Sequence, residues 1–241
     1  MTTESGRDTP QPILQHLEEL RWRIVRIAVG IVVAAIVALV FSDWIKELIE
    51  RPILDACGEC ELQVLGATEQ FSVLMRIGLF GGVILASPVI LWQLWGFISP
   101  ALTIRERRWA IPIIAACAAL FSVGVAFGYW VLPRGLEFLL NIFPDVRTDL
   151  RMLEYFSFSM RFMLAFGASF LYPVFLFSAA AAGIVSSEQL ARGRRWAVLI
   201  IVIAAALITP TGDALTLALL SVPLYFFYEV TYWLVRLLLR K

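Results

Sequence analysis

Residues 24–41 read IVRIAVGIVVAAIVALVF, a run of 18 residues in which Arg26 is the single charged side chain. A helix needs about 20 consecutive apolar residues to cross the hydrocarbon core of a bilayer, so this run predicts a transmembrane helix. The segment before it is polar and carries both acidic and basic side chains, unlike a secretory signal peptide. We therefore expect the helix to be retained in the mature protein.

The composition of the whole chain agrees with a membrane protein. Of its 241 residues, 60% are hydrophobic and 16% are charged, against about 45–50% and about 25% in soluble domains. This balance excludes a water-soluble globule. The formal net charge of +1 gives no basic surface for DNA or RNA, so we expect no nucleic-acid partner. One polytopic domain in the lipid bilayer is the simplest interpretation.

Five further apolar runs follow, so the sequence predicts an all-α, polytopic membrane fold with six transmembrane helices. The fifth run is too short for an undistorted bilayer, since its 13 residues give about 20 Å of helix against about 30 Å of hydrocarbon. A turn at 209–213 then returns the chain, so the fifth and sixth helices should be short and form a hairpin that thins the membrane locally. The five runs are 71–95, 109–132, 155–185, 196–208 and 214–235.

The positions of the basic residues predict the orientation. Most of the 20 Lys and Arg fall before the first run, in the second and fourth connections, and after the sixth run. By the positive-inside rule both termini lie in the cytoplasm. We expect a flexible cytoplasmic N-terminus at 1–12, a membrane domain at 13–236 and a cytoplasmic tail at 237–241. Three prolines should shape the helices and turns, with the main bend at the second: Pro88, Pro173 and Pro210.

No combination of residues in the sequence is typical of a catalytic or metal site. His16 is the single histidine, which excludes a histidine metal cluster or a Ser-His-Asp triad, and no glycine-rich phosphate loop is present. We therefore expect neither an enzyme nor a cofactor. Cys57 and Cys60 lie in the first outer loop, where they form a local disulfide or remain idle thiols. Cys117 in the third run fits core packing.

Two acidic residues at the predicted cytoplasmic surface are candidates for a binding site. Glu19 precedes the first apolar run, and Glu106 lies among three arginines in the second connection. Each could pair with neighbouring arginines, Glu19 with Arg21 or Arg23. If the two carboxylates instead face one another, they suit a ligand with adjacent guanidinium groups, because arginine binds carboxylates through two parallel hydrogen bonds. Such a groove would be a site for arginines rather than for phosphate.

Polar residues inside the predicted spans are a second group of candidates, because they are costly to place in lipid. Gln93 and Glu229 lie in the second and sixth runs, and Arg76 and Arg161 near the outer ends of the second and fourth. Interhelical hydrogen bonds or contacts with headgroups would make them structural. The functional alternative is a proton-coupled small-molecule transporter that uses Glu229 and Gln93. Such transporters usually show two related halves, and none is evident in this sequence.

Several motifs in order along the chain resemble the TatC family, the polytopic receptor subunit of the Sec-independent twin-arginine protein translocase. The stretch HLEELRWR at 16–23 is similar to the family's HLxELRxR signature. The resemblance covers about residues 13–236. The other matching segments are ASPVILWQLW at 86–95, SPAL at 99–102 with ERR at 106–108, AFGASF at 165–170 with Pro173, Thr209 and Pro210 with Asp213, and PLY at 223–225 with Glu229.

The resemblance implies a receptor for precursor proteins whose signal peptides carry two consecutive arginines. It assigns signal-peptide binding to Glu19 and Glu106, with Arg21 and Arg107 in the same cytoplasmic patch. It also implies export of folded proteins driven by the proton-motive force across the cell inner (cytoplasmic) membrane. Single-span TatA-like and TatB-like subunits would pack mainly along the fifth and sixth helices. The sequence leaves open whether the chain forms a homo-oligomer within a receptor complex.

Two positions depart from the family's pattern. The family has a glutamate inside the fourth helix where this chain has Leu171, so the role of that carboxylate in contacts with single-span partners is not transferred. Asp213 stands one residue further from Thr209 and Pro210 than in the family's Thr-Pro-Pro-Asp form. With Gln93 and Glu229, it is predicted to make intramembrane or partner contacts.

Overall fold

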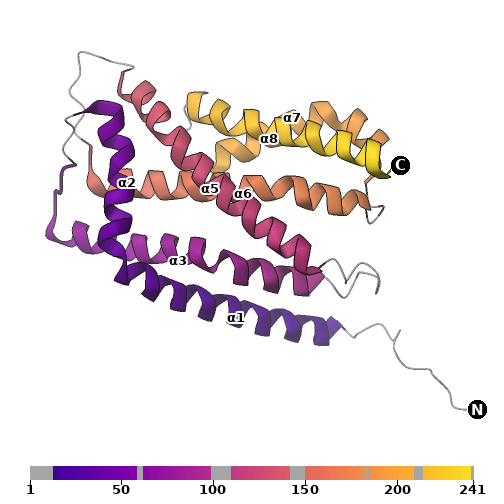
Figure 1. Cartoon of the computed structure of the whole chain (residues 1–241), viewed down its shortest axis with the longest axis horizontal. Coiled ribbons are helices and arrows are strands. Elements are labelled where there is room, and N and C mark those ends of the chain that lie inside the picture. The colour runs from indigo at the N-terminus through magenta and orange to yellow at the C-terminus, as the bar shows by residue number, and fades with distance from the viewer. Residues whose placement is uncertain are drawn as a thin grey trace, which may run out of the picture.

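The computed structural model describes residues 13–58, 62–98, 110–141, 150–181, 183, 185–208 and 214–239. Over these residues the chain is helical apart from short connections, which confirms the all-α prediction. Most helices run along the molecule, α5 is inclined across them, and α2 lies crosswise at one end (Figure 1). The elements are α1 (Ile13–Val40), α2 (Ser42–Cys57), α3 (Ala67–Ile98), α5 (Ala110–Leu140), α6 (Met152–Ala181), α7 (Ser187–Ile208), α8 (Ala214–Leu234) and a π-helical turn (Val235–Leu239).

Among the described residues, five helices are long and apolar enough to cross a membrane: α1, α3, α5, α6 and α8 with its continuation. The expected fifth span corresponds to α7, which has 22 residues because it begins at Ser187 and not at 196. Ser186 explains the early start: its hydroxyl accepts the N–H of Gln189 at 3.2 Å, and the Gln189 side chain accepts the N–H of Ser186 at 2.9 Å. This capping box starts the helix within a charged segment, so the apolar part keeps its predicted length.

Helix α2 was not predicted from the sequence. It is amphipathic, and Pro52 lies inside it. Because proline has no N–H, the carbonyl of Leu48 one turn earlier lacks its helical donor, and the hydroxyl of Tyr129 on α5 donates to it at 3.0 Å. The hydroxyl of Tyr155 on α6 donates to the neighbouring carbonyl of Ile49 at 2.5 Å. Two tyrosines therefore fix this crosswise helix to the bundle.

Small residues allow the long helices to approach closely, as is typical of membrane helices. Where α1 packs along α3, a Cβ on Gly82 would lie 2.8 Å from the Cα of Ala35. Where α5 packs on α6, a Cβ on Gly124 would lie 2.7 Å from the carbonyl oxygen of Phe166. Aromatic rings of α6 fill the centre, with the ring centroids of Phe162 and Phe166 4.8 Å apart. The core thus sits around α6.

The structure can be compared with the prediction at two of the three prolines and at the end of α6. Pro88 and Pro173 lie inside α3 and α6, and both helices continue past them. α6 ends at Ala181 rather than near 185, close to Gly183, whose φ of 77° ends a helix readily. Residues 1–12 and Pro210 lie outside the described residues.

Candidate functional site

Glu19 lies on α1 itself and is ion-paired. The helix begins at Ile13, well before the apolar run, so the HLEELRWR segment is helical. Glu19 Oε1 accepts hydrogen bonds from Arg23 Nε at 3.0 Å and from Nη2 at 2.5 Å. Arg23 is four residues further along and shares a helix face with Glu19, whereas Arg21 is only two residues away and does not. Of the two expected pairings, the structure therefore contains the one with Arg23.

Arg23 also joins the start of α1 to the end of α3. Its Nη1 donates to the carbonyl of Gln93 at 3.2 Å, and its Nη2 to the carbonyl of Gly96 at 2.8 Å. Gly96 lies in the last turn of α3, where carbonyls lack intrahelical donors, so a cation that donates to its carbonyl is stabilising. Gly96 makes room for this contact, since a Cβ there would overlap Nη1. We call Glu19, Arg23, Gln93 and Gly96 the Arg23 clasp.

The clasp can be tested by a double-mutant cycle. Arg23→Gln should lower the stability of the purified protein by about 1–3 kcal/mol, because hydrogen bonds from a charged donor are lost. Gly96→Ala should cost less, because the end of the Arg23 side chain can move aside and alanine gains up to about 1 kcal/mol of helix propensity. Together they should cost little more than Arg23→Gln alone, since that variant already removes the contacts that Gly96→Ala disturbs. Thermal unfolding in detergent measures this. Arg26→Gln, an exposed residue one turn further along α1, is the control, and additive losses in the double variant would refute the clasp.

Several predicted site residues remain untested by the structure. Glu106, Arg107 and Asp213 lie outside the described residues. Arg21 is described and exposed on α1. Gln93 takes part in the clasp through its backbone carbonyl, while its side chain is half-buried. Sequence reasoning did not identify Gly96, because nothing in a local motif shows that an arginine from another helix needs space beside it.

Glu229 belongs to a separate cluster that joins α7 to α8. Its Oε2 accepts a hydrogen bond from Arg194 Nη2 at 2.9 Å, and its Oε1 accepts one from the hydroxyl of Tyr225 at 3.0 Å. The Arg194 guanidinium also lies 4.6 Å from the ring centroid of Tyr232. Glu229 thus joins α8 to α7, whereas Gln93 contributes its backbone carbonyl to the contact between α3 and α1. The arrangement does not resemble the shared cavity that the transporter alternative requires.

Leu171, at the position of the family's intramembrane glutamate, is surrounded by apolar side chains. It packs with Val174 against a small cluster whose buried members are Leu91, Ile114 and Cys117. These residues come from α3, α5 and α6. Glu69, in the first turn of α3, accepts the backbone N–H groups of Leu65 and Leu153 at 2.8 and 3.1 Å. Glu69 therefore fastens the loop before α3 to the start of α6.

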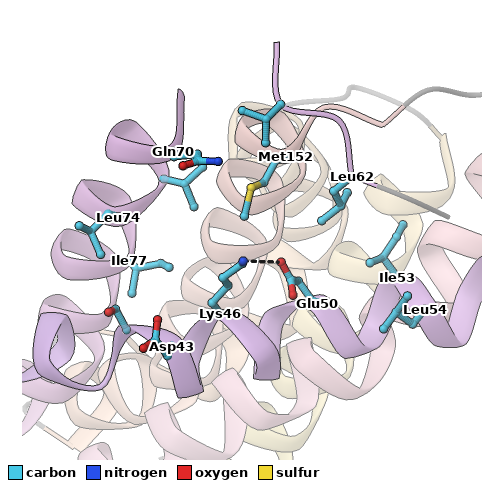
Figure 2. A pocket seen from close by; sticks show the side chains of 13 residues that line it. Asp43, Lys46, Glu50, Ile53, Leu54, Leu62, Gln70, Leu74, Ile77 and Met152 are labelled. Atoms are coloured by element: carbon cyan, nitrogen blue, oxygen red, sulfur yellow. Dashed lines mark ion pairs between the residues drawn. The ribbon is translucent and has the colours of Figure 1, made fainter. Parts of the chain in front are cut away.

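A cavity and a disulfide-bonded cysteine lie at the α2 end of the molecule. A cavity of about 640 Å³ lies between α2, the first turns of α3 and the start of α6. Figure 2 shows Lys46 and Glu50 projecting into it from α2, with Nζ and Oε1 3.7 Å apart. This pair neutralises the one cation of the lining. Cys57 at the end of α2 is disulfide-bonded and Cys117 is free, while Cys60 lies outside the described residues.

Comparison with known proteins identifies the family. A family model described as Sec-independent protein translocase protein (TatC) matches residues 15–223. The chain belongs to the TatC family. A TatC of Aquifex aeolicus is 36% identical, over 95% of this chain and 97% of the relative. The TatC of Escherichia coli K12 is 32% identical, over 94% and 88%.

A solved structure agrees with this assignment. A crystal structure described as the twin-arginine translocase receptor TatC matches with a TM-score of 0.83 at 37% identity, covering 92% of this chain and 98% of that one. The fold and the sequence motifs therefore point to the same family. TatC proteins are membrane components of a protein translocase, so this chain is a multi-pass translocase subunit and not an enzyme.

Proposed function

We propose that this TatC protein is the receptor for twin-arginine signal peptides and the core subunit of a translocase that exports folded proteins with the proton-motive force. The observation that carries the recognition step is the Glu19–Arg23 pair. Its carboxylate already holds a guanidinium through two N–H groups in a half-buried position. A signal-peptide arginine would offer Glu19 the same chemistry, so it would bind by exchange with Arg23 or beside it.

The clasp also suggests how the second acid joins the site. Arg23 is bonded to Gly96 at the end of α3, and the segment that carries Glu106 follows that helix directly in the sequence. A receptor built this way would present Glu19 from α1 and Glu106 from the adjoining connection to two neighbouring arginines. Arg21 and Arg107 would flank the acids. Their positive charge would keep ligands with a single cationic group from binding to the patch.

The proposed location is the cell inner membrane with both termini in the cytoplasm. The excess of basic residues in the segments predicted to be cytoplasmic supports this orientation. The disulfide at Cys57 supports it too, because disulfides persist on the oxidising side of the membrane, where α2 would then lie. In this orientation the Arg23 clasp faces the compartment in which precursors are made.

Single-span TatA-like and TatB-like subunits are the proposed partners, and α7 offers them a surface. Trp196, Ile200, Ile203 and Leu207 are all exposed, and their spacing places them on one face of the helix. A face of this kind suits a second membrane helix. The short apolar part of α7 would also thin the bilayer beside that contact, which would ease passage of a folded cargo.

Site-specific crosslinking in inverted membrane vesicles tests the recognition step. A photo-crosslinker in place of Glu18, exposed beside Glu19, should capture a precursor with a twin-arginine signal and not one with two lysines, since lysine lacks the planar fork of arginine. A matched probe in place of Glu47, an exposed acid on α2, should capture neither. Equal capture of both precursors, or capture at Glu47 alone, would contradict the proposal.

A further inference from the structure

Arg76 on α3 and Arg161 on α6 lie within one helical turn of the same interhelical contact, at Ser157. The Nη1 of Arg76 on α3 donates a hydrogen bond to the hydroxyl of Ser157 on α6. Arg161 follows Ser157 by four residues, so it stands one turn further along a nearby face of α6. Its side chain is exposed, and in a membrane-spanning helix exposure at this place means contact with lipid. We call Arg76 and Arg161 the arginine pair.

Helix α2 shows how deep the arginine pair lies. One face of α2 lines the cavity at the end of the molecule, which Ile77 of α3 and Met152 of α6 also line. The other face lines an apolar cavity of about 630 Å³ with Phe80 and Met160 from the same two helices. An amphipathic helix with a polar and an apolar face marks the boundary between headgroups and hydrocarbon. Arg76 and Arg161 therefore lie at or just inside this boundary.

The arginine pair differs from the other described cations at this end, each of which pairs with a carboxylate or lies over an aromatic ring. Lys46, Arg51 and Arg151 each pair with a carboxylate, and Arg134 lies 4.1 Å from the ring centroid of Trp130. Among the described residues, neither Arg76 nor Arg161 forms an ion pair. Glu154, two turns from Arg161 on α6, is paired with Arg151 at 3.4 Å, and Glu69 is engaged by backbone N–H groups.

We propose that the arginine pair binds the phosphodiester of a phospholipid in the leaflet at the α2 end, with a preference for an anionic lipid such as phosphatidylglycerol. Two unpaired guanidinium groups in lipid are costly, and a phosphate removes that cost because it accepts the parallel hydrogen bonds of the arginine fork. Side chains of a helix lean toward its N-terminus, which for both helices is the α2 end, so both guanidinium groups point to the headgroup layer. The phosphate of phosphatidylglycerol carries an unbalanced negative charge, whereas the choline group of phosphatidylcholine already balances its phosphate, so two guanidinium groups favour the anionic lipid.

Native mass spectrometry of the full chain, released from vesicles of phosphatidylglycerol and phosphatidylcholine, tests the proposal. The unaltered protein should retain phosphatidylglycerol preferentially. Arg161→Gln should reduce this retention roughly fivefold, as expected for one arginine near a membrane surface, and Arg76→Gln with Arg161→Gln should reduce it further. Arg134→Gln and Arg151→Gln, at the same end, are matched controls and should retain the lipid.

Two results of this experiment would overturn the lipid site. One is equal retention of the two lipids by the unaltered protein, and the other is a loss in the controls as large as in Arg161→Gln. Arg161 makes no hydrogen bond or ion pair with described residues, so Arg161→Gln should fold normally, and its helical circular dichroism checks this. A photo-crosslinker in place of Arg161 should label phospholipid in native membranes. Labelling of a protein helix instead would show that a partner subunit covers the site, which also contradicts the proposal.

Discussion

Replacing Glu19 and Glu106 together by alanine is expected to weaken binding of a twin-arginine signal peptide by about 100-fold or more. Hydrogen bonds between charged groups contribute about 1.5–3 kcal/mol each, and the double variant removes both carboxylates from the proposed site. Titration of the purified protein with a labelled signal peptide measures the affinity. For contacts at an exposed surface, binding to the unaltered protein should also weaken as salt is added.

A neighbouring acid provides the control for this prediction. Glu18 is exposed next to Glu19 on α1, so Glu18→Ala removes the same charge from the same helix without removing the proposed contact. Its affinity should change by little. Because Glu19→Ala also releases one partner of Arg23, thermal unfolding of each variant is needed to show that α1 and α3 remain together. Unchanged binding by a folded double variant would refute the assignment of both acids.

Gly124→Ala should lower the free energy of unfolding by about 1–3 kcal/mol, as an overpacked core does. The added Cβ would lie 2.7 Å from the carbonyl oxygen of Phe166 and 2.9 Å from the Cα of Gly167. These are backbone atoms of α6, so the clash cannot be relieved by a change of rotamer. The helices α5 and α6 would have to separate, and α6 holds much of the core. Thermal unfolding in detergent should show a fall of several degrees in Tm.

Gly135→Ala is the matched control on the same helix. Its Cβ would meet the nearest atom, in Leu219, at 3.7 Å, which is ordinary contact. Both substitutions gain the same intrinsic helix propensity, up to about 1 kcal/mol, so the difference between the two variants reports packing alone. Gly135→Ala should be neutral or stabilising. A Gly124→Ala protein as stable as Gly135→Ala would mean that α5 and α6 are less tightly packed than the structure indicates.

The predictions from sequence succeeded where the signal is local. The apolar runs are continuous in the chain, and each one coincides with a helix. The predicted helix boundaries were wrong where polar residues extend a helix beyond its apolar run. This is so at the start of α7, where Ser186 and Gln189 cap the helix. Helix α2 was missed because it is short, carries a proline and is amphipathic rather than apolar. The pairing of Glu19 with Arg23 was foreseen as one of two options, since it depends on residues four apart.

The sequence by itself determined the membrane class, the number of apolar helices and the family, because hydrophobic length and short motifs are properties of neighbouring residues. Only the tertiary structure decided that Arg23 reaches the carbonyls of Gln93 and Gly96, that Glu229 pairs with Arg194, and that Arg76 stands beside the turn carrying Arg161. Each of these contacts joins helices that are distant in the chain. Their partners are set by how glycines and aromatic rings let the helices pack, and no sequence period encodes that packing.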